Sequence, residues 1–197
     1  SSSSSYSVSS STGDIAIGSS ASSNFTVDAG TQTSPDPTLT FAMDTPNANF
    51  GNFSAATTTT SSATFSVINY TSYGYVVQLV GAPPTNGGNE ITPMTTTGPS
   101  QPGIEQFGVN LVANTSPISF GANPNNGTPP NNFGFGTVAT DYSTPNQFRF
   151  VSGETVASAP KSSGKTIYTL SYIVNVSSLT PAGVYKSDQT LVVTGTY

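Results

Sequence analysis

The residues suited to acid–base or nucleophilic chemistry are few in this sequence, and their spacing completes no catalytic site. There is no His and no Cys, which excludes imidazole bases, thiol nucleophiles, disulfides and the usual zinc ligands. Glu90, Glu105 and Glu154 are the candidates for a glycosidase-type pair, which needs two carboxyl groups facing one bond. Glu90 and Glu154 stand beside turn-forming residues and Glu105 opens a predicted strand. The sequence therefore favours structural roles for all three.

Two short segments match part of the residue spacing of known catalytic motifs. Ser162-Ser-Gly-Lys165 has the S-x-x-K spacing of a serine acyl-enzyme, and Gly164-Lys165-Thr166 resembles the end of a phosphate-binding loop. Both motifs require a helix, whereas Pro160 precedes this segment and a strand pattern follows it. We therefore expect a solvated loop here. The sequence predicts no catalytic residue, no metal ion, no cofactor and no enzymatic activity.

Composition indicates an extracellular setting. Lys and Arg number 4 against 9 Asp and Glu, which gives a net charge of -5. Four cations are too few for a nucleic-acid-binding face. Charged residues are 7% of the chain, whereas cytoplasmic domains usually carry about 25%, so the polar surface consists of Ser, Thr, Asn and Gln. No apolar run is long enough for a transmembrane helix. We expect a secreted, cell-surface protein.

Apolar residues recur two positions apart in short runs, which is the pattern of half-buried strands. The runs are Tyr6 and Val8, Ile15 and Ile17, Phe25 and Val27, Leu39–Met43, Ala63–Val67, Tyr73–Leu79, Phe107–Ala113, Phe133 and Phe135, Phe148 and Phe150, Tyr168–Val176, and Leu191–Tyr197. No helical period of useful length occurs. The expected fold is all-β, an antiparallel two-sheet sandwich of immunoglobulin-like or jelly-roll type with about nine or ten strands and no substantial helix.

The segment Leu179–Tyr185 is the most specific local feature. Pro181 and Gly183 are expected to set a tight crossing before the last strand. Tyr185 then has two alternatives. Its hydroxyl returns to a backbone group a few residues upstream, as in a tyrosine corner, or its ring simply points inward at a strand start. Both roles are structural.

The carboxyl-terminal residues resemble a known style of surface protein. Tyr168–Val176, Thr180–Tyr185 and Leu191–Tyr197 form a strand, a P-A-G-x-Y turn and a terminal strand. This pattern is similar to the carboxyl end of secreted bacterial surface proteins of the spore-coat-U-like, WxL-like and camelysin/TasA-like groups. The chain lacks the Trp of WxL motifs and the Cys pairs of coat-U domains. The resemblance implies a cell-surface β-sandwich capable of polymerising, and it transfers no catalytic residue.

The N-terminal segment suggests assembly. We expect residues 1–13 to form an extended tail and residues 14–197 a single domain. Tyr6 and Val8, like Ile15 and Ile17, alternate as a weak strand does and are the predicted assembly residues. A strand that completes a neighbour's sheet propagates head to tail. The sequence thus favours a non-catalytic homopolymer, either a pilus-like or fimbria-like filament or a surface coat. The alternative is that this strand pairs with its own sheet.

A monomeric adhesin is the other function considered. Tyr73 and Tyr75 are predicted to share one strand face and, with the loop Gly81–Gly103, to contact host or surface glycans. Sequons for N-glycosylation occur at a frequency that chance explains. They are Asn24, Asn52, Asn69, Asn114, Asn126 and Asn175.

Overall fold

The structure is a computed structural model that describes residues 18–21, 26–29, 38–71, 73–126 and 135–196. The chain divides into two units, Ser1–Pro37 and Thr38–Tyr197. The boundary thus follows Pro37, not Gly13 as the sequence suggested.

In the first unit, β1 (Gly18–Ala21) and β2 (Thr26–Ala29) form an antiparallel hairpin. The predicted assembly residues and one sequon lie outside the described residues. These are Tyr6, Val8, Ile15, Ile17 and Asn24.

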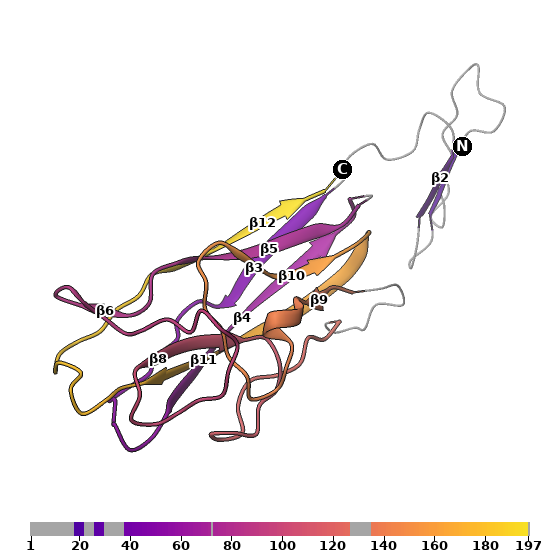
Figure 1. The fold of residues 1–197 in the computed structure, drawn as a ribbon. Coiled ribbons are helices and arrows are strands. Elements are labelled where there is room, and N and C mark those ends of the chain that lie inside the picture. The colour runs from indigo at the N-terminus through magenta and orange to yellow at the C-terminus, as the bar shows by residue number, and fades with distance from the viewer. Residues whose placement is uncertain (1–17, 22–25, 30–37, 72, 127–134, 197) are drawn as a thin grey trace. The chain divides into compact units, whose positions relative to one another are not determined.

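The second unit consists of two four-stranded antiparallel sheets (Figure 1). The first sheet has the order β12 (Gln189–Gly195), β5 (Tyr75–Gly81), β10 (Glu154–Ala159), β9 (Thr137–Val138). The second has the order β3 (Leu39–Thr45), β4 (Thr59–Asn69), β11 (Ser163–Asn175), β8 (Gln106–Asn110). A two-stranded ribbon, β6 (Thr85–Asn86) and β7 (Asn89–Glu90), and one 3-10 turn, Thr140–Tyr142, complete the described elements. The prediction of an all-β, two-sheet sandwich is confirmed.

Strands β4 and β11 form the centre of the second sheet. Their inner faces carry the apolar residues that the period of two predicted, such as Phe65 and Val67 in β4 and Tyr168 and Leu170 in β11, and all four are buried. Phe65 and Tyr168 are register partners, and their rings stack with centroids 4.9 Å apart. Directly opposite residues share a face of the sheet, so this stack fixes the register of the pair.

The outer face of β11 is also buried, because the long loops predicted between strands fold over it. Ile173 packs there with Met94, Phe148 and Phe120 in a second apolar cluster. The Ser171 hydroxyl donates to the carbonyl of Val112 (3.3 Å). Loop residues thus form a third layer on this side, which explains why β11 is buried along both faces.

The core between the sheets combines aliphatic side chains with several aromatic rings. Phe107 and Phe150 meet edge to face with centroids 4.7 Å apart. The hydroxyls of Tyr75 in the first sheet and Tyr168 in the second share a buried hydrogen bond of 2.8 Å. Buried hydroxyls need such partners, so this pair joins the sheets without leaving a polar atom unsatisfied.

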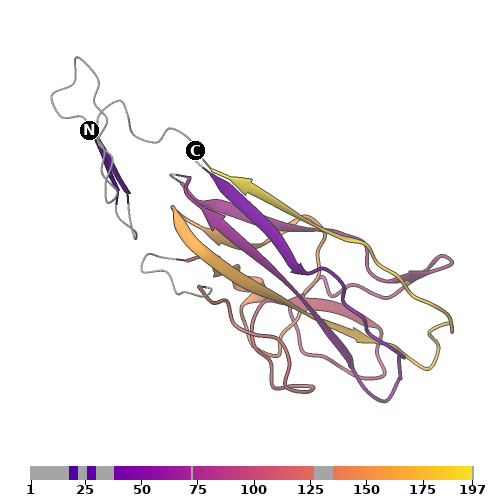
Figure 2. The same cartoon turned by 180° about the vertical axis from the view of Figure 1, so that it is seen from behind.

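The two long sides of the sandwich differ. On the β8 and β9 side, the 3-10 turn closes the gap, since the Tyr142 carbonyl accepts the Leu111 N–H (3.0 Å) and Ala139 N–H donates to Val156 (2.9 Å). On the other side, β3 and β12 are the edges of their sheets. They lie beside each other in both views (Figures 1 and 2). Within the described residues, no strand pairing joins them.

Candidate functional site

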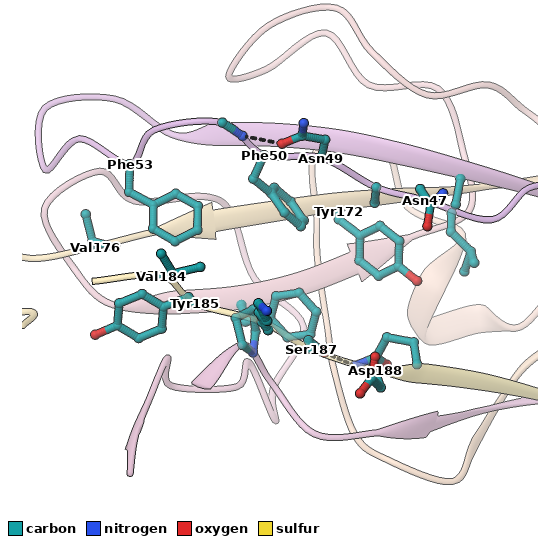
Figure 3. A pocket seen from close by; sticks show the side chains of 18 of the residues that line it. Asn47, Asn49, Phe50, Phe53, Tyr172, Val176, Val184, Tyr185, Ser187 and Asp188 are labelled. Carbon is teal, nitrogen blue, oxygen red and sulfur yellow. Dashed lines mark hydrogen bonds between the residues drawn. The ribbon is translucent and has the colours of Figure 1, made fainter. Parts of the chain in front are cut away.

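A cavity of about 1290 Å³ opens along the β3 and β12 side of the sandwich. Residues from both edge strands and from the loops that follow β3 and β11 line it (Figure 3). Its deepest residues are inner-face side chains of the sheets, namely Ala63, Leu79, Phe107, Leu170 and Tyr172. The cavity is therefore a part of the sandwich interior that the described residues leave unfilled. We call it the edge groove.

The inner face of β3 forms one wall of the edge groove. Phe41 is the register partner of Val67 and Met43 of Phe65, so these side chains point to the core side of the sheet. Val67 and Phe65 are fully buried, yet Phe41 is 37% exposed and Met43 38% exposed. Two large apolar side chains are thus turned inward, and the described residues leave more than a third of each exposed.

Strand β12 borders the groove on the opposite sheet. Its inward residues Leu191 and Val193 pair with Leu79 and Val77 of β5. Both are half-buried and pack against the main core cluster. The inward side chains of β12 are thus better covered than those of β3.

Aromatic rings close one end of the edge groove. Phe50 and Phe53 come from the loop after β3, Tyr185 from the loop after β11 and Tyr172 from β11 itself, and Figure 3 shows the four rings gathered there. Ring centroids lie 6.3 Å apart for Phe50 and Tyr172, and 6.0 Å apart for Phe53 and Tyr185. Burial raises the pKa of the Tyr172 hydroxyl above its ordinary value. This end therefore suits an apolar or aromatic side chain.

The predicted crossing before the last strand has defined contacts. The Tyr185 hydroxyl donates to the Pro181 carbonyl (2.9 Å), four residues upstream, which is the contact that the tyrosine-corner alternative describes. Gly183 has a φ of +152°, and a Cβ there would lie 1.9 Å from the Asn86 amide nitrogen. This amide also donates to the Ala182 carbonyl (3.3 Å). Only glycine fits at position 183, because the side chain of Asn86 in the β6–β7 ribbon occupies the space that a Cβ would need.

The structure does not assemble the carboxylates into a pair that acts on one bond. Glu90 is exposed in β7. Glu105 accepts hydrogen bonds from the hydroxyls of Thr180 and Thr92. Glu154 is bound by Arg149. Glu105 and Glu154 thus have different hydrogen-bond partners, and Glu90 faces solvent, so the three carboxylates do not share one site.

The S-x-x-K motif does not form a catalytic turn either, because Lys165 lies in β11 and not on a helix. Among the described residues, no group of three His, Cys, Asp or Glu side chains is placed to hold a metal ion.

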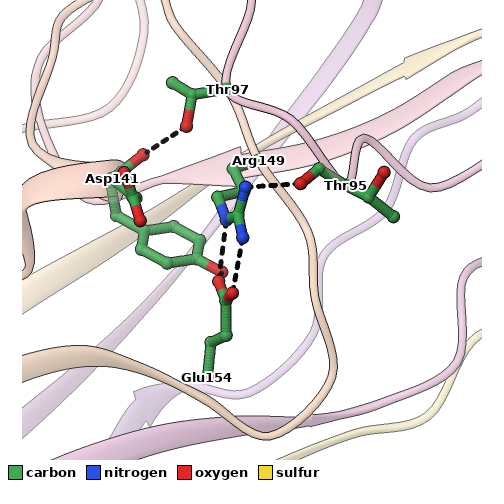
Figure 4. A network of polar contacts seen from close by, with 6 residues as sticks. Thr95, Thr97, Asp141, Arg149 and Glu154 are labelled. Carbon is green, nitrogen blue, oxygen red and sulfur yellow. Dashed lines mark hydrogen bonds and ion pairs between the residues drawn. The ribbon is translucent and has the colours of Figure 1, made fainter.

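Sequence reasoning missed a polar network around the single arginine (Figure 4). The Arg149 guanidinium donates to both Glu154 oxygens (2.8 and 2.5 Å) and to the Thr95 carbonyl. The Tyr142 hydroxyl donates to the same carboxylate (2.7 Å). These hydrogen bonds from Arg149 lower the pKa of Glu154, and burial raises that of Tyr142. The network ties the loop after β7 to the 3-10 turn.

The predicted tyrosine platform is wrong. Tyr73 lies in a turn and is 67% exposed, whereas Tyr75 begins β5 and is buried against Tyr168. The strand cannot extend back to Tyr73 because Gly74 has a φ of +87°, and a Cβ there would lie 1.8 Å from the Ala159 carbonyl oxygen. The glycine between the two tyrosines was the signal for this break.

Three of the six sequons have an asparagine that is buried in the folded protein. The side chains of Asn69, Asn114 and Asn175 are buried. Asn114 exchanges amide hydrogen bonds with Asn110 (2.7 and 2.9 Å), which is a structural role. Asn52 is exposed and remains accessible to modification. Asn126 is half-buried, with no assigned role.

No protein-family model, no curated protein and no solved structure matches this chain. In the part of the chain that the structure describes, no helix is long and apolar enough to cross a membrane.

Proposed function

We propose that the chain is a non-catalytic structural subunit of an extracellular filament or surface coat, in which the N-terminal segment of one copy fills the edge groove of the next. The edge groove carries this proposal. Partly exposed apolar side chains on the inner face of an edge strand are typical of a sandwich that accepts a strand from another chain. Phe41 and Met43 line the groove, and the described residues leave more than a third of each side chain exposed.

The N-terminal sequence supplies a suitable occupant. Tyr6 and Val8 are apolar residues two positions apart, and small serines flank them. A strand added to a sheet turns alternate side chains inward, so Tyr6 and Val8 would enter the groove together while Ser5, Ser7 and Ser9 face outward. Burying two such side chains contributes about 1.5–3 kcal/mol each, and backbone hydrogen bonds along the edge add to this.

The geometry of the second unit favours addition in one direction. Thr38 and Thr196 lie at the same end of the sandwich, since Thr38 accepts from Tyr70 and Thr196 from the nearby Tyr73. The chain therefore enters the second unit at one end, while the aromatic end of the edge groove lies among loops after β3 and β11. A contact between a tail and a groove on different surfaces is heterologous and propagates instead of closing as a dimer.

The surface chemistry is consistent with this proposal. A net charge of -5 spread over 197 residues leaves little repulsion between stacked copies. The resemblance of residues 168–197 to secreted surface proteins supports the same setting. The adhesin alternative is weakened, because its platform of Tyr73 and Tyr75 does not exist.

Two matched charge substitutions test the proposal. Val8→Asp would place a carboxylate in an apolar groove, which costs several kcal/mol, so we expect polymers to disappear in negative-stain images and in sedimentation. Ser9→Asp adds the same charge on the outward side, so polymers should persist. Deletion of Ser1–Ser11 should behave as Val8→Asp does and still give a folded β protein by circular dichroism. Normal assembly of the deleted protein would overturn the proposal.

A further inference from the structure

Two edges border the groove, β3 and β12, and a donor strand can hydrogen-bond to only one of them at a time. We infer that the donor segment of a second copy adds to the free edge of β12 and lays Tyr6 and Val8 over Phe41 and Met43. This inference rests on the proposed function. It goes further by assigning the acceptor edge and by excluding Ile15 and Ile17 as the inserted pair.

Coverage of the inward side chains distinguishes the two edges. Phe41 and Met43 on β3 are 37% and 38% exposed, whereas Leu191 on β12 is packed against the core. The first sheet therefore ends before it covers β3. Neighbouring strands lie about 4.8 Å apart and facing sheets about 10 Å apart, so one strand added beside β12 extends the first sheet across the groove and above β3.

A strand added to β3 would have the opposite effect. It would extend the second sheet away from the groove, where no strand of the first sheet faces it, because that sheet ends at β12. Phe41 and Met43 would then stay uncovered. The apolar side chains of the donor would also face solvent, which removes the main source of binding free energy.

An unpaired polar atom lies at the start of β12. The side-chain oxygen of Gln189 is buried and finds no hydrogen-bond donor among the described residues, although its amide nitrogen donates to Ala82 and Ser187. Gln189 lines the edge groove. A buried acceptor without a partner is costly, and a backbone N–H of a strand entering beside β12 would satisfy it. No comparable unpaired atom occurs in the described part of β3.

The donor residues can be assigned from the face of the strand on which they lie and from their distance in the sequence to β1. Tyr6 and Val8 have even numbers and Ile15 and Ile17 odd ones, so a single extended strand turns the two pairs to opposite faces. Only one pair enters the groove. In the sequence, Ile17 directly precedes β1, which pairs with β2 of its own unit, whereas Tyr6 and Val8 stand about ten residues before this hairpin. We therefore assign insertion to Tyr6 and Val8.

Disulfide crosslinking tests both assignments, because the chain has no cysteine of its own. Ser7→Cys reports on the outward face of the Tyr6 and Val8 strand, and Ala16→Cys is the matched reporter for Ile15 and Ile17. Acceptor cysteines go to exposed outward positions on each edge. They are Thr190→Cys, Val192→Cys and Thr194→Cys on β12, and Thr40→Cys and Ala42→Cys on β3. Copies with one donor cysteine are mixed with copies with one acceptor cysteine, oxidised and run on a denaturing gel.

We expect Ser7→Cys to give a crosslinked dimer with at least one β12 position and none with β3. Crosslinks to β3, crosslinks from Ala16→Cys alone, or polymers without any β12 crosslink would overturn this inference and leave the proposed function intact. Copies that form neither polymers nor crosslinks would overturn both. A chain carrying Ser7→Cys and a β12 cysteine that closes on itself would also overturn both, because the tail would then fill its own groove.

Discussion

At the scale of single residues, several buried asparagines are paired with dedicated partners from the loops. Asn110 and Asn114 exchange two amide hydrogen bonds, and the Asn146 N–H donates to Asn114 (2.8 Å). Asn146 has a φ of +63°, a conformation that asparagine tolerates better than most residues. Asn114, which the sequence presents as a sequon, thus acts as a structural link between β8 and a loop.

Glu154→Gln should destabilise the fold, because it removes the charge that holds Arg149 and leaves a partly buried cation without its partner. Losing one partner of such a charge-assisted bond costs about 1–3 kcal/mol. Urea unfolding measures this loss. Glu90→Gln is the matched control, since Glu90 is exposed on β7, and it should change stability little.

The cost of Glu154→Gln should also depend on pH. The Glu154 pKa is lowered from its ordinary value of 4.5, mainly by hydrogen bonds from Arg149. A lowered folded-state pKa gives stability that is fully present above the ordinary pKa and is lost as pH falls through the folded one. The difference between the two proteins should therefore be largest near pH 7 and shrink below about pH 4.5. A constant difference across this range would contradict the assignment.

Tyr185→Phe isolates the hydrogen bond at the final crossing. The ring stays against Phe53, while the bond to the Pro181 carbonyl is lost. We expect a loss of about 0.5–1.5 kcal/mol in the free energy of unfolding. Tyr73→Phe removes a hydroxyl from a ring that is 67% exposed and should be neutral. Equal effects of the two substitutions would show that the Tyr185 bond is not stabilising.

At the scale of secondary structure, local alternation predicted the strands whose faces are buried. Ala63–Val67 lies in β4, and the predicted run Tyr168–Val176 lies in β11 up to Asn175, because packing of both sheets reinforces their period of two. Alternation failed at Tyr73, where a glycine turn interrupts it.

Alternation also could not reveal the edge groove. Leu39, Phe41 and Met43 have the same period as the core strands, yet two of them are exposed. Strand order depends on pairings between residues far apart in the chain, which no local pattern encodes.

Phe41→Ser should separate folding from assembly. Truncating a fully buried phenylalanine costs about 3–5 kcal/mol, but Phe41 is 37% exposed, so the monomer should lose much less. Polymer formation should fall strongly, because the donor strand loses its main apolar contact. Thr40→Ser on the outer face of the same strand is the control. A large drop in the stability of the monomer with normal assembly would contradict this role for β3.

At the scale of the whole molecule, the asymmetry of the sandwich is the decisive property. The 3-10 turn and the Arg149 network close one long side, while the other side keeps a cavity of about 1290 Å³. In the proposed assembly, a subunit with one tail and one groove has two different binding ends, so we expect directional polymers.

Two defective copies should therefore complement each other. A copy lacking Ser1–Ser11 keeps its edge groove but has no donor segment. A copy with Phe41→Asp keeps its donor segment, but a carboxylate in its edge groove prevents binding. Neither should polymerise alone. Mixed together they should form a 1:1 dimer and stop there, because the dimer has no free functional end of either kind. Size-exclusion chromatography with light scattering measures this product. Absence of the dimer, with both copies folded by circular dichroism, would contradict exchange between copies, and growth into longer polymers would show that a second contact drives assembly.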